Sequence, residues 1–496
     1  MPSRAEAVRS LLVLFWTAAV PIMVTAAGAA EAPAEAPPAS VTSLTAFHVS
    51  PDGDDAAEGS AAHPFATLNR AAEALRGSPV RVVYVAAGTY RPTVSLRLGR
   101  EHSGVAILAA PEQRPVIEGA CLGENSLILL DGADGVTIAG FHFVDSSAEG
   151  SLRLRHANRN RVLANRFSRT GTAIVLDASS RNTVSGNWIE RSAQSAIEAK
   201  DGSDQNLFDS NRVDGTGAPE TTGGGFFLHG VNNNRVAHNL VENTRGMGIG
   251  VLSWDAATTN IGNVIAYNVV RRANQDAVDS GAIYMLGRSQ VDTRARIEGN
   301  LVDGAGRPDQ HTIGIYLDDS TSGVDVLGNV VRDTGRHAVQ IHGGDDNLVT
   351  SNLLDLGSSN ASAVLFQAAP ADTAPANTMR NNVVSGNIIY SASAAPVSFD
   401  WIDGGVPDIH GNLYVNPYGA FTSYGPTSDT NPLSGDPGFA DPGAGDYSMR
   451  ERSTAALIGF RGLDLALVGP RRDAAWWSGV QESMQPAADV AGRQCG

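Results

Sequence analysis

A short segment with apolar residues on both sides of an asparagine recurs nine times, as in RVAHNLV and DVLGNVV. Neighbouring copies lie 22 to 35 residues apart. A variable period around a constant short strand indicates one coil per repeat, with insertions at the turns, whereas helical solenoids have periods fixed by their helix pairs. The pattern therefore predicts an all-β fold, a right-handed single-stranded parallel β-helix from about residue 80 to 415. The asparagines are Asn165, Asn187, Asn211, Asn239, Asn268, Asn300, Asn329, Asn352 and Asn387.

The repeated asparagines are expected to be structural. In each coil the inward Val, Ile and Leu side chains would stack on those of the neighbouring coils. Asparagine tolerates a left-handed backbone and can hydrogen-bond the next asparagine in the stack. We therefore place each asparagine at a bend and assign no catalytic role to it.

Composition supports a β-rich chain without polyanionic partners. The 496 residues include 54 Gly and 24 Pro, and charged residues are 18% of the chain, below the roughly 25% typical of soluble domains. The formal net charge of −16 argues against nucleic acid as a partner. The two cysteines, Cys121 and Cys495, could pair outside the cytoplasm, but they make neither a disulfide framework nor a zinc site.

The N-terminus has the order of a secretory signal peptide. Arg4 and Arg9 precede an apolar run, and a small-residue cleavage site follows at Ala27-Gly28-Ala29. We predict a signal peptide at 1–29 and a disordered Ala/Pro linker at 30–43. The mature protein is then expected to be secreted or periplasmic, monomeric and without a membrane anchor.

The remaining chain is predicted to be one β-helix domain at 44–470, followed by a tail at 471–496. Apolar residues at helical spacing in 64–77 predict a helix that covers the N-terminal end of the stack. The segment 436–460 interrupts the repeat and is expected to close the other end irregularly.

Several segments resemble a known family. FHVSPDGDD, HPFATLNRAAEAL and VVYVAAGTY are similar to the opening of secreted right-handed parallel β-helix carbohydrate-active enzymes. DSGAIY, GIYLDDSTSG, IHGGDDNLV and DPGFADP resemble glycoside hydrolase family 141 and, more distantly, family 120. The resemblance covers about residues 46 to 470, with Ser280 in place of a usual glycine. It implies a fucosidase-, xylanase- or xylosidase-like activity.

Alternation along five consecutive coils separates inward from outward residues. The inward set is Phe226, Leu228, Ile283, Met285, Ile315, Leu317, Val339 and Ile341. One outward column is Phe227, Gly250, Tyr284, Tyr316 and Gln340. The second outward column is His229, Leu252, Leu286, Asp318 and His342. Neighbours in a column would lie about 4.8 Å apart.

Acidic residues are predicted at both lips of this outward face. Asp279 and His311 each precede a tyrosine of the first column by five residues, and Asp319 begins the turn after Asp318. This arrangement predicts a groove along several coils, floored by Tyr284 and Tyr316.

Paired carboxylates suit the hydrolysis of a glycosidic bond, because one protonates the leaving oxygen and the other attacks or activates water. We predict Asp279 and Asp319 as the catalytic pair, with Asp318 as the substitute if its side chain points the right way. A solvated turn is the alternative for such a pair, and Asp345-Asp346 is read in that way. No cofactor or metal is required, and no specific motif supports calcium. The substrate is a poly- or oligosaccharide, and its predicted contacts are Tyr284, Tyr316, His311, His342, Trp254 and Asp255.

Two other functions fit the same fold. A polysaccharide lyase or epimerase would act on uronates with calcium and an arginine base, for which Arg245, Arg271 and Arg272 lie nearest. The single lysine, Lys200, lies about four coils from Asp318. A non-catalytic carbohydrate-binding surface protein would repeat aromatic residues up one face, whereas here they concentrate on a few coils.

Overall fold

The computed structural model describes residues 45–146, 150–217, 223–307, 310–370, 378–442, 446–450, 453–460 and 464–471. The predicted signal peptide, the predicted linker and Cys495 lie outside the described residues. Among the helices that are described, none has the length and apolar character needed to cross a membrane.

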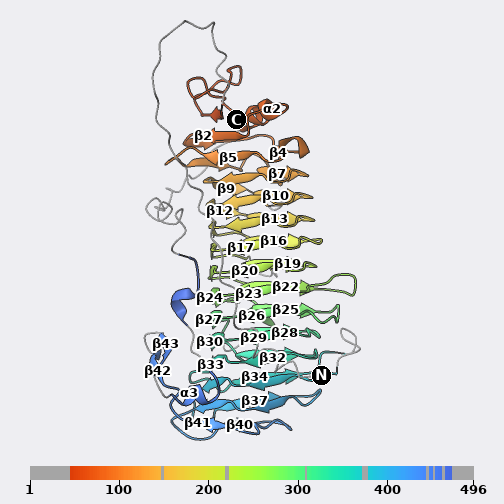
Figure 1. The fold of residues 1–496 in the computed structure, drawn as a ribbon, viewed down its shortest axis with the longest axis vertical. Coiled ribbons are helices and arrows are strands. Elements are labelled where there is room, and N and C mark those ends of the chain that lie inside the picture. The colour runs from red at the N-terminus through yellow and green to blue at the C-terminus, as the bar shows by residue number, and fades with distance from the viewer. Residues whose placement is uncertain are drawn as a thin grey trace, which may run out of the picture. The chain divides into compact units, whose positions relative to one another are not determined.

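Three long parallel sheets form the body of the molecule, and each turn of the chain adds one strand to each sheet (Figure 1). Sheet A has 14 strands. Its first seven are β1 (Phe47–Val49), β2 (Val82–Val85), β5 (Ala106–Ala109), β8 (Thr137–Ala139), β11 (Arg161–Leu163), β14 (Thr183–Ser185) and β17 (Leu207–Asp209). The others are β20 (Arg235–Ala237), β23 (Val264–Ala266), β26 (Arg296–Glu298), β29 (Asp325–Leu327), β32 (Leu348–Thr350), β35 (Val383–Ser385) and β38 (Asp408–His410).

Sheet B also has 14 strands. Its first seven are β3 (Gly88–Tyr90), β6 (Pro115–Glu118), β9 (His142–Ser146), β12 (Arg166–Thr170), β15 (Trp188–Glu190), β18 (Arg212–Asp214) and β21 (Leu240–Glu242). The others are β24 (Val269–Ala273), β27 (Leu301–Ala305), β30 (Val330–Thr334), β33 (Leu353–Asp355), β36 (Ile388–Tyr390), β39 (Leu413–Val415) and β41 (Leu433–Ser434).

Sheet C has 13 strands and carries the predicted functional residues. Its first seven are β4 (Leu96–Leu98), β7 (Ile128–Asp131), β10 (Leu152–Arg155), β13 (Ile174–Asp177), β16 (Ile197–Lys200), β19 (Phe226–His229) and β22 (Ile249–Ser253). The others are β25 (Ser280–Gly287), β28 (Thr312–Asp318), β31 (Val339–His342), β34 (Ser362–Gln367), β37 (Val397–Trp401) and β40 (Thr422–Ser423). The predicted parallel β-helix is thus confirmed, and its strands extend beyond the predicted range at both ends.

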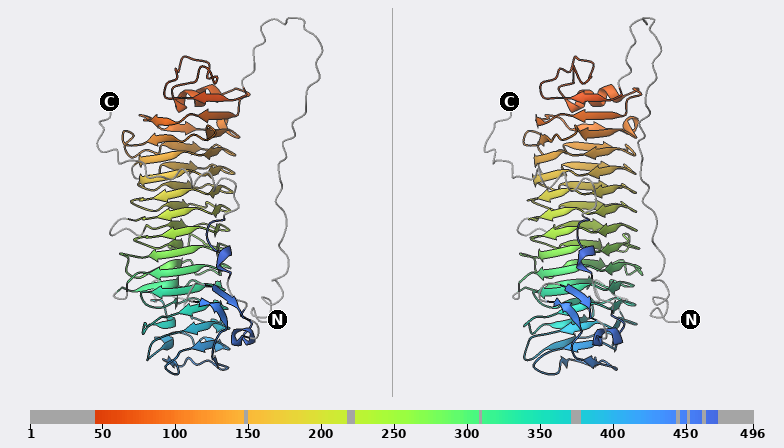
Figure 2. Two further views of the ribbon diagram at one scale, coloured as in Figure 1. Left: turned by 90° about the vertical axis from the view of Figure 1, so that its left-hand side faces the viewer. Right: turned by 60° about the vertical axis from the view of Figure 1, so that its left-hand side comes forward.

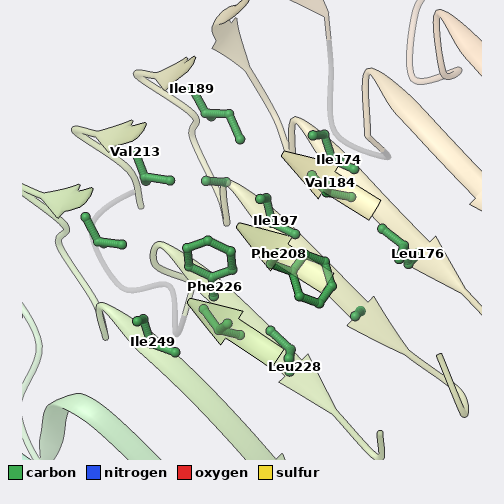
Figure 3. Packing of buried hydrophobic residues seen from close by; sticks show 14 of the residues in the cluster. Ile174, Leu176, Val184, Ile189, Ile197, Phe208, Val213, Phe226, Leu228 and Ile249 are labelled. Carbon is green, nitrogen blue, oxygen red and sulfur yellow. The ribbon is translucent and has the colours of Figure 1, made fainter. Parts of the chain in front are cut away.

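The core fills the space enclosed by the three sheets. Side chains such as Ile174, Phe208 and Phe226 point into this space from different sheets (Figure 3). All eight residues predicted to face inward belong to this core and are at most 1% exposed. Burial of these stacked apolar side chains is the main stabilising contribution to the fold.

The predicted asparagines form one continuous ladder. In each step, the backbone N–H and side-chain amide of one asparagine both donate to Oδ1 of the asparagine on the next coil, as Asn239 does to Asn268 at 2.9 Å. The ladder continues to Asn412, whose amides donate to the carboxylate of Asp429. One detail of the prediction is wrong. The left-handed residue is the one before each asparagine, such as Tyr267 with φ 56°, because the turn is completed before the asparagine side chain enters the buried ladder.

A second asparagine ladder, which the sequence reasoning missed, runs five residues ahead of the first. In it Asn160, Asn182, Asn206, Asn234 and Asn263 bond one another in succession. Its signal was present in the sequence as a second asparagine directly before β11, β14, β17, β20 and β23 of sheet A. Both bends of that strand are therefore satisfied by asparagine side chains.

Helix α2 (Leu68–Leu75) lies within the range predicted for a helix at the N-terminal end. The hydroxyl of Thr67 caps it by accepting from Arg70 N, and its buried side chains include Leu68, Ala71 and Leu75. These side chains belong to the core, and the helix lies beside β4 at the N-terminal end of the stack (Figure 1). A short 3-10 helix, η1 (Arg100–His102), follows β4.

The described residues of the C-terminal segment (436–442, 446–450, 453–460 and 464–471) lie along the outer face of sheet B (Figure 2). It includes the antiparallel pair β42 (Phe439–Asp441) and β43 (Asp446–Met449), helix α3 (Thr454–Leu457) and η3 (Leu465–Leu467). The expectation that residues 436–460 close the end of the stack is therefore wrong. Sheet B has an apolar stripe on its outer face, and its exposure to water would be unfavourable. Phe439, Tyr447 and Phe460 pack on this stripe and bury it. The stripe consists of Val269, Leu301, Val330, Leu353, Ile388 and Leu413.

We predict that Asn268→Ala lowers the free energy of unfolding by about 2–4 kcal/mol, because it leaves buried amides of Asn239 and the carbonyl of Val236 without their partner. Urea denaturation measures the change. The control is Asn431→Ala, at an exposed position outside both ladders. Equal stability of the two variants would contradict a structural role for the ladder.

Candidate active site

The observed strand register confirms both predicted outward columns on sheet C. Tyr284 pairs with Tyr316, which pairs with Gln340. In the second column Leu286 pairs with Asp318, and β31 brings His342 onto the next coil. The residues therefore meet because inserted turns change the coil length without changing the strand register.

The two tyrosines predicted to form the floor of the groove are covered by other side chains. Tyr284 is 7% exposed and Tyr316 1% exposed, within a second apolar cluster outside the core. Met247 is one of the residues that cover Tyr284. It fits there because residue 250 is a glycine: a Cβ at this position would lie 2.0 Å from Sδ of Met247. Only the hydroxyl ends of the tyrosines are left for polar contacts.

Asp318 is the centre of a buried hydrogen-bond network. Its Oδ2 accepts from the Tyr284 hydroxyl at 2.6 Å, and its Oδ1 lies 2.5 Å from His342 Nδ1. The backbone N–H of Asp319 also donates to Oδ1, at 2.8 Å. The side chain of Asp318 is only 8% exposed. These three contacts hold the carboxylate in one orientation.

Asp319 has a different partner, which the sequence reasoning missed. Arg288 Nε donates to Asp319 Oδ2 at 2.6 Å, and the guanidinium of Arg288 lies 5.5 Å from the ring centroid of Trp254. Arg288 follows Leu286 of the second column by two residues, so the register could have placed it beside the Asp318-Asp319 turn. Trp254, 37% exposed, thus borders the site through Arg288.

Asp279 reaches the same network from the preceding coil. Its Oδ1 accepts from the Tyr316 hydroxyl at 3.2 Å, and that hydroxyl lies 3.4 Å from His342 Nδ1. His311 Nε2 is 4.0 Å from Asp279 Oδ1 and contacts Gln340 Oε1 at 2.9 Å. The side chain of Asp279 is 67% exposed. One exposed and one buried carboxyl group are thus connected through Tyr316 and His342.

The two carboxyl groups have opposite pKa shifts. Desolvation and then the negative charge of Asp318 raise the pKa of Asp279, and the large exposed fraction of its side chain limits that shift. Burial alone would raise the pKa of Asp318, but hydrogen bonds from His342 and Tyr284 outweigh it and lower that pKa. Burial likewise opposes the charged form of His342, yet its contact with Asp318 raises the imidazole pKa. Asp318 and His342 therefore form an ion pair.

The turn that carries the two aspartates depends on a close backbone approach. A Cβ at Gly287 would lie 2.5 Å from Cα of Thr321, so only glycine lets β25 pass this turn. Thr321 Oγ1 donates to the carbonyls of Met285 and Asp318, which fixes the turn to the preceding coil. Asp319 itself has a left-handed φ of 38°.

Asp318, Asp319 and His342 are the described residues that could hold a metal ion together, since their donor atoms lie within 4.8 Å of one another. Those atoms already have partners. Arg288 bonds Asp319, and His342 Nδ1 bonds Asp318, so a cation would have to displace two positively charged groups. The donor set fits an internal ion-pair network better than a calcium site, which favours carbonyl and carboxylate oxygens.

Other residues predicted near the site have local roles. The carboxylate of Asp255 accepts from the backbone of Ala257 and Thr258 within its own turn. His229 lies 6.4 Å from Trp254, measured between ring centroids. Asp345 accepts from Thr378 and Arg380 at a turn, in agreement with its predicted structural role.

The arginines considered for a lyase are paired elsewhere. Arg245 bonds Asp276 at 2.9 Å, Arg271 lies 3.5 Å from Asp303, and Arg272 lies 3.4 Å from Glu242. Lys200 bonds Glu198 at 3.0 Å. Each of these side chains would have to leave its carboxylate partner and lose a proton before it could act as a base.

Comparison with known proteins agrees with the fold. A family model described as "Right handed beta helix region" matches residues 117–270. A variant of the catalytic domain of a GH87 α-1,3-glucanase in complex with tetrasaccharides superposes with a TM-score of 0.50 at 15% identity, over 80% of this chain and 69% of that chain. The chain is therefore a right-handed parallel β-helix protein.

Two further solved structures are more distant. XylC in complex with xylose has a TM-score of 0.41 at 12% identity, over 80% of this chain and 87% of that chain. A rhamnogalacturonan lyase has a TM-score of 0.40 at 16% identity, over 69% and 87% of the two chains. No curated protein sequence matches this chain.

The Asp318–His342 ion pair predicts a pH-dependent contribution to stability. The lowered pKa of Asp318 stabilises the fold above the ordinary Asp pKa, and the raised pKa of His342 stabilises it below the ordinary His pKa. His342→Gln should therefore lower the free energy of unfolding most between about pH 4 and 6.5, by about 1–3 kcal/mol. The loss should shrink as the pH rises through the His342 pKa or falls through the Asp318 pKa.

Chemical denaturation at a series of pH values measures this dependence. His410→Gln is the matched control, because His410 pairs with Asp408 at the surface, where solvent screens the charges. A destabilisation by His342→Gln that does not change with pH would rule out the ion pair.

Proposed function

We propose that this protein is a glycoside hydrolase that cleaves a poly- or oligosaccharide, with Asp279 and Asp318 as its acid and base. The observation that carries the proposal is the pairing of an exposed and a buried carboxyl group through Tyr316 and His342. Environments that push two carboxyl pKa values apart mark an acid and its partner. The similar solved structures that act on carbohydrates agree with this class but do not decide the chemistry.

Asp279 is suited to act as the general acid. Its raised pKa keeps a proton on the carboxyl group at higher pH than usual, and its exposure lets a substrate approach. The proton passes to the glycosidic oxygen as the bond to the anomeric carbon breaks. The Tyr316 hydroxyl positions this carboxyl group.

Asp318 is suited to act as the base. Its pKa is lowered, so the carboxylate stays ionised, and three hydrogen bonds leave it fixed rather than free to attack carbon. A water molecule that gives its proton to Asp318 can attack the anomeric carbon and become the new hydroxyl group. Asp319 is bonded by Arg288 and is assigned to positioning this turn, so Asp318 replaces it in the catalytic pair.

A uronate lyase or epimerase is the second candidate, because the same fold occurs in a rhamnogalacturonan lyase. Its base would remove a proton from carbon, and calcium would hold the uronate. The paired arginines and the occupied donor atoms described above favour hydrolysis.

Replacement of either carboxyl group tests the proposal. Asp279→Asn and Asp318→Asn should each lower kcat by about 10²–10⁴-fold on a substrate that the parent protein cleaves. Asp279→Asn should leave Tm nearly unchanged, whereas Asp318→Asn removes the ion pair with His342 and should lower Tm while the protein stays folded at the assay temperature. The control is Asp276→Asn, three residues before Asp279, whose half-exposed carboxylate pairs with Arg245. Near-parental turnover by both test variants would show that these carboxyl groups are not catalytic.

The reaction products separate the two candidates. We expect a panel of plant and microbial polysaccharides to yield new reducing ends without the absorbance of unsaturated uronate, and EDTA to leave the rate unchanged. Unsaturated product, or loss of activity in EDTA that calcium restores, would favour the lyase.

A further inference from the structure

A polar cavity lies on the coils that follow the acid pair. It encloses about 490 Å³ between the bends that precede β31, β34 and β37. Its lining includes Arg336, Ser359, Asn360, Ala395, Asp400 and Tyr424. None of these residues has a role in the network around Asp318.

Side-chain contacts link the cavity to the proposed acid. Arg336 lies at its edge, and one guanidinium nitrogen contacts His311 Nδ1 at 3.3 Å. His311 in turn lies 4.0 Å from Asp279. Asp279 precedes β25 and Asn360 precedes β34, three coils later, which corresponds to about 14 Å along the stack. A single extended ligand can therefore reach both places.

The lining has the chemistry of a sugar-binding pocket. Asp400 accepts hydrogen bonds, Arg336 donates them, and Asn360 can do both. Tyr424 is 52% exposed, so its ring offers a flat surface to the apolar face of a sugar. His337 belongs to the wall, because it is buried and bonded to Ser362 at 2.7 Å.

The lining favours a ligand without net charge. Arg336 and Asp400 carry opposite charges. Burial, followed by the charge of Arg336, lowers the pKa of His337 to about 3, so this imidazole adds no charge. A uronate or sulfated unit would face Asp400, and a cationic unit would face Arg336.

A larger cavity, of about 790 Å³, lies at the last coils, and the residues that line it include no basic side chain. Asp429 in its lining already accepts from Asn412 and Tyr414. Residues such as Phe421 and Leu433 also line it. None of the described residues that line it contacts Asp279 or His311.

We propose that the cavity at Arg336, Asn360, Asp400 and Tyr424, whose lining lies two to five coils from Asp279, is a subsite for a neutral sugar unit of the substrate. This inference rests on the proposed function, since it extends the groove of the same site. It implies a substrate of several sugar units rather than a disaccharide or a short aryl glycoside.

Kinetics on oligosaccharides of increasing length test the subsite. In the parent protein kcat/KM should rise with length until the chain fills the cavity. Tyr424→Ala and Asp400→Asn should each reduce the ratio of kcat/KM for long over short substrates by about tenfold, as expected for one lost stacking or charged hydrogen-bond contact. Tyr418→Ala is the matched control, at a tyrosine that is 69% exposed and outside the cavity lining. An unchanged ratio in both test variants, with parental Tm, would overturn the subsite.

Binding separates failure of the subsite from failure of the hydrolase proposal. The probe is an array of neutral and acidic oligosaccharides, read with labelled parent and variant proteins in the absence of turnover. One outcome would support the subsite and reject the hydrolase proposal. In it, the parent cleaves no substrate but binds neutral oligosaccharides, Tyr424→Ala loses this binding, and Tyr418→Ala keeps it. Absence of parental binding, a preference for acidic oligosaccharides, or equal binding by both variants would overturn the subsite.

Discussion

The asparagine ladder is the interaction on which the rest of the structure depends. Each buried side chain, such as that of Asn268, joins its own coil to the next and also bonds the backbone of the preceding coil. A bend in the chain leaves backbone groups that the sheets cannot pair, and burial of unpaired groups is costly. The ladder satisfies these groups at the same place in every coil. Coil length can then vary at the other turns while the strands stay in register.

Because the strand register is constant, side chains at equivalent positions of successive coils lie close together. Asp279, Asp318 and His342 come from three coils, yet they share one network because their strands are stacked at about 4.8 Å. Glycines at crowded positions serve this stacking. Gly287 allows the turn of Asp318 to lie against β25, and Gly250 leaves space for Met247. The apolar cover over Tyr284 lowers the local polarity, and hydrogen bonds to Asp318 are therefore stronger than they would be in water.

The same outward face changes character along the stack. On the N-terminal coils its charges are paired with each other, as in Arg153 with Asp177 and Lys200 with Glu198. Around β25 and β28 it becomes a buried network with one exposed carboxyl group, and farther on it opens into a polar cavity. This order along one sheet is what a groove for an extended ligand requires. Sheet B, in contrast, has its outer face covered by the C-terminal segment and is closed to ligands there.

The amino-acid sequence alone is enough to predict the coil architecture, the asparagine ladder and the columns that bring Asp279, Asp318 and His342 together. These features follow from short-range alternation and from a repeat, both of which are visible without knowing the turns. The covering of the tyrosines and the position of the C-terminal segment depend on the tertiary structure. Met247 and Phe460 reach their places from an inserted turn and from a non-repeating segment, whose paths no periodicity specifies. The choice between Asp318 and Asp319 likewise depends on side-chain direction at a left-handed turn, where strand alternation ends.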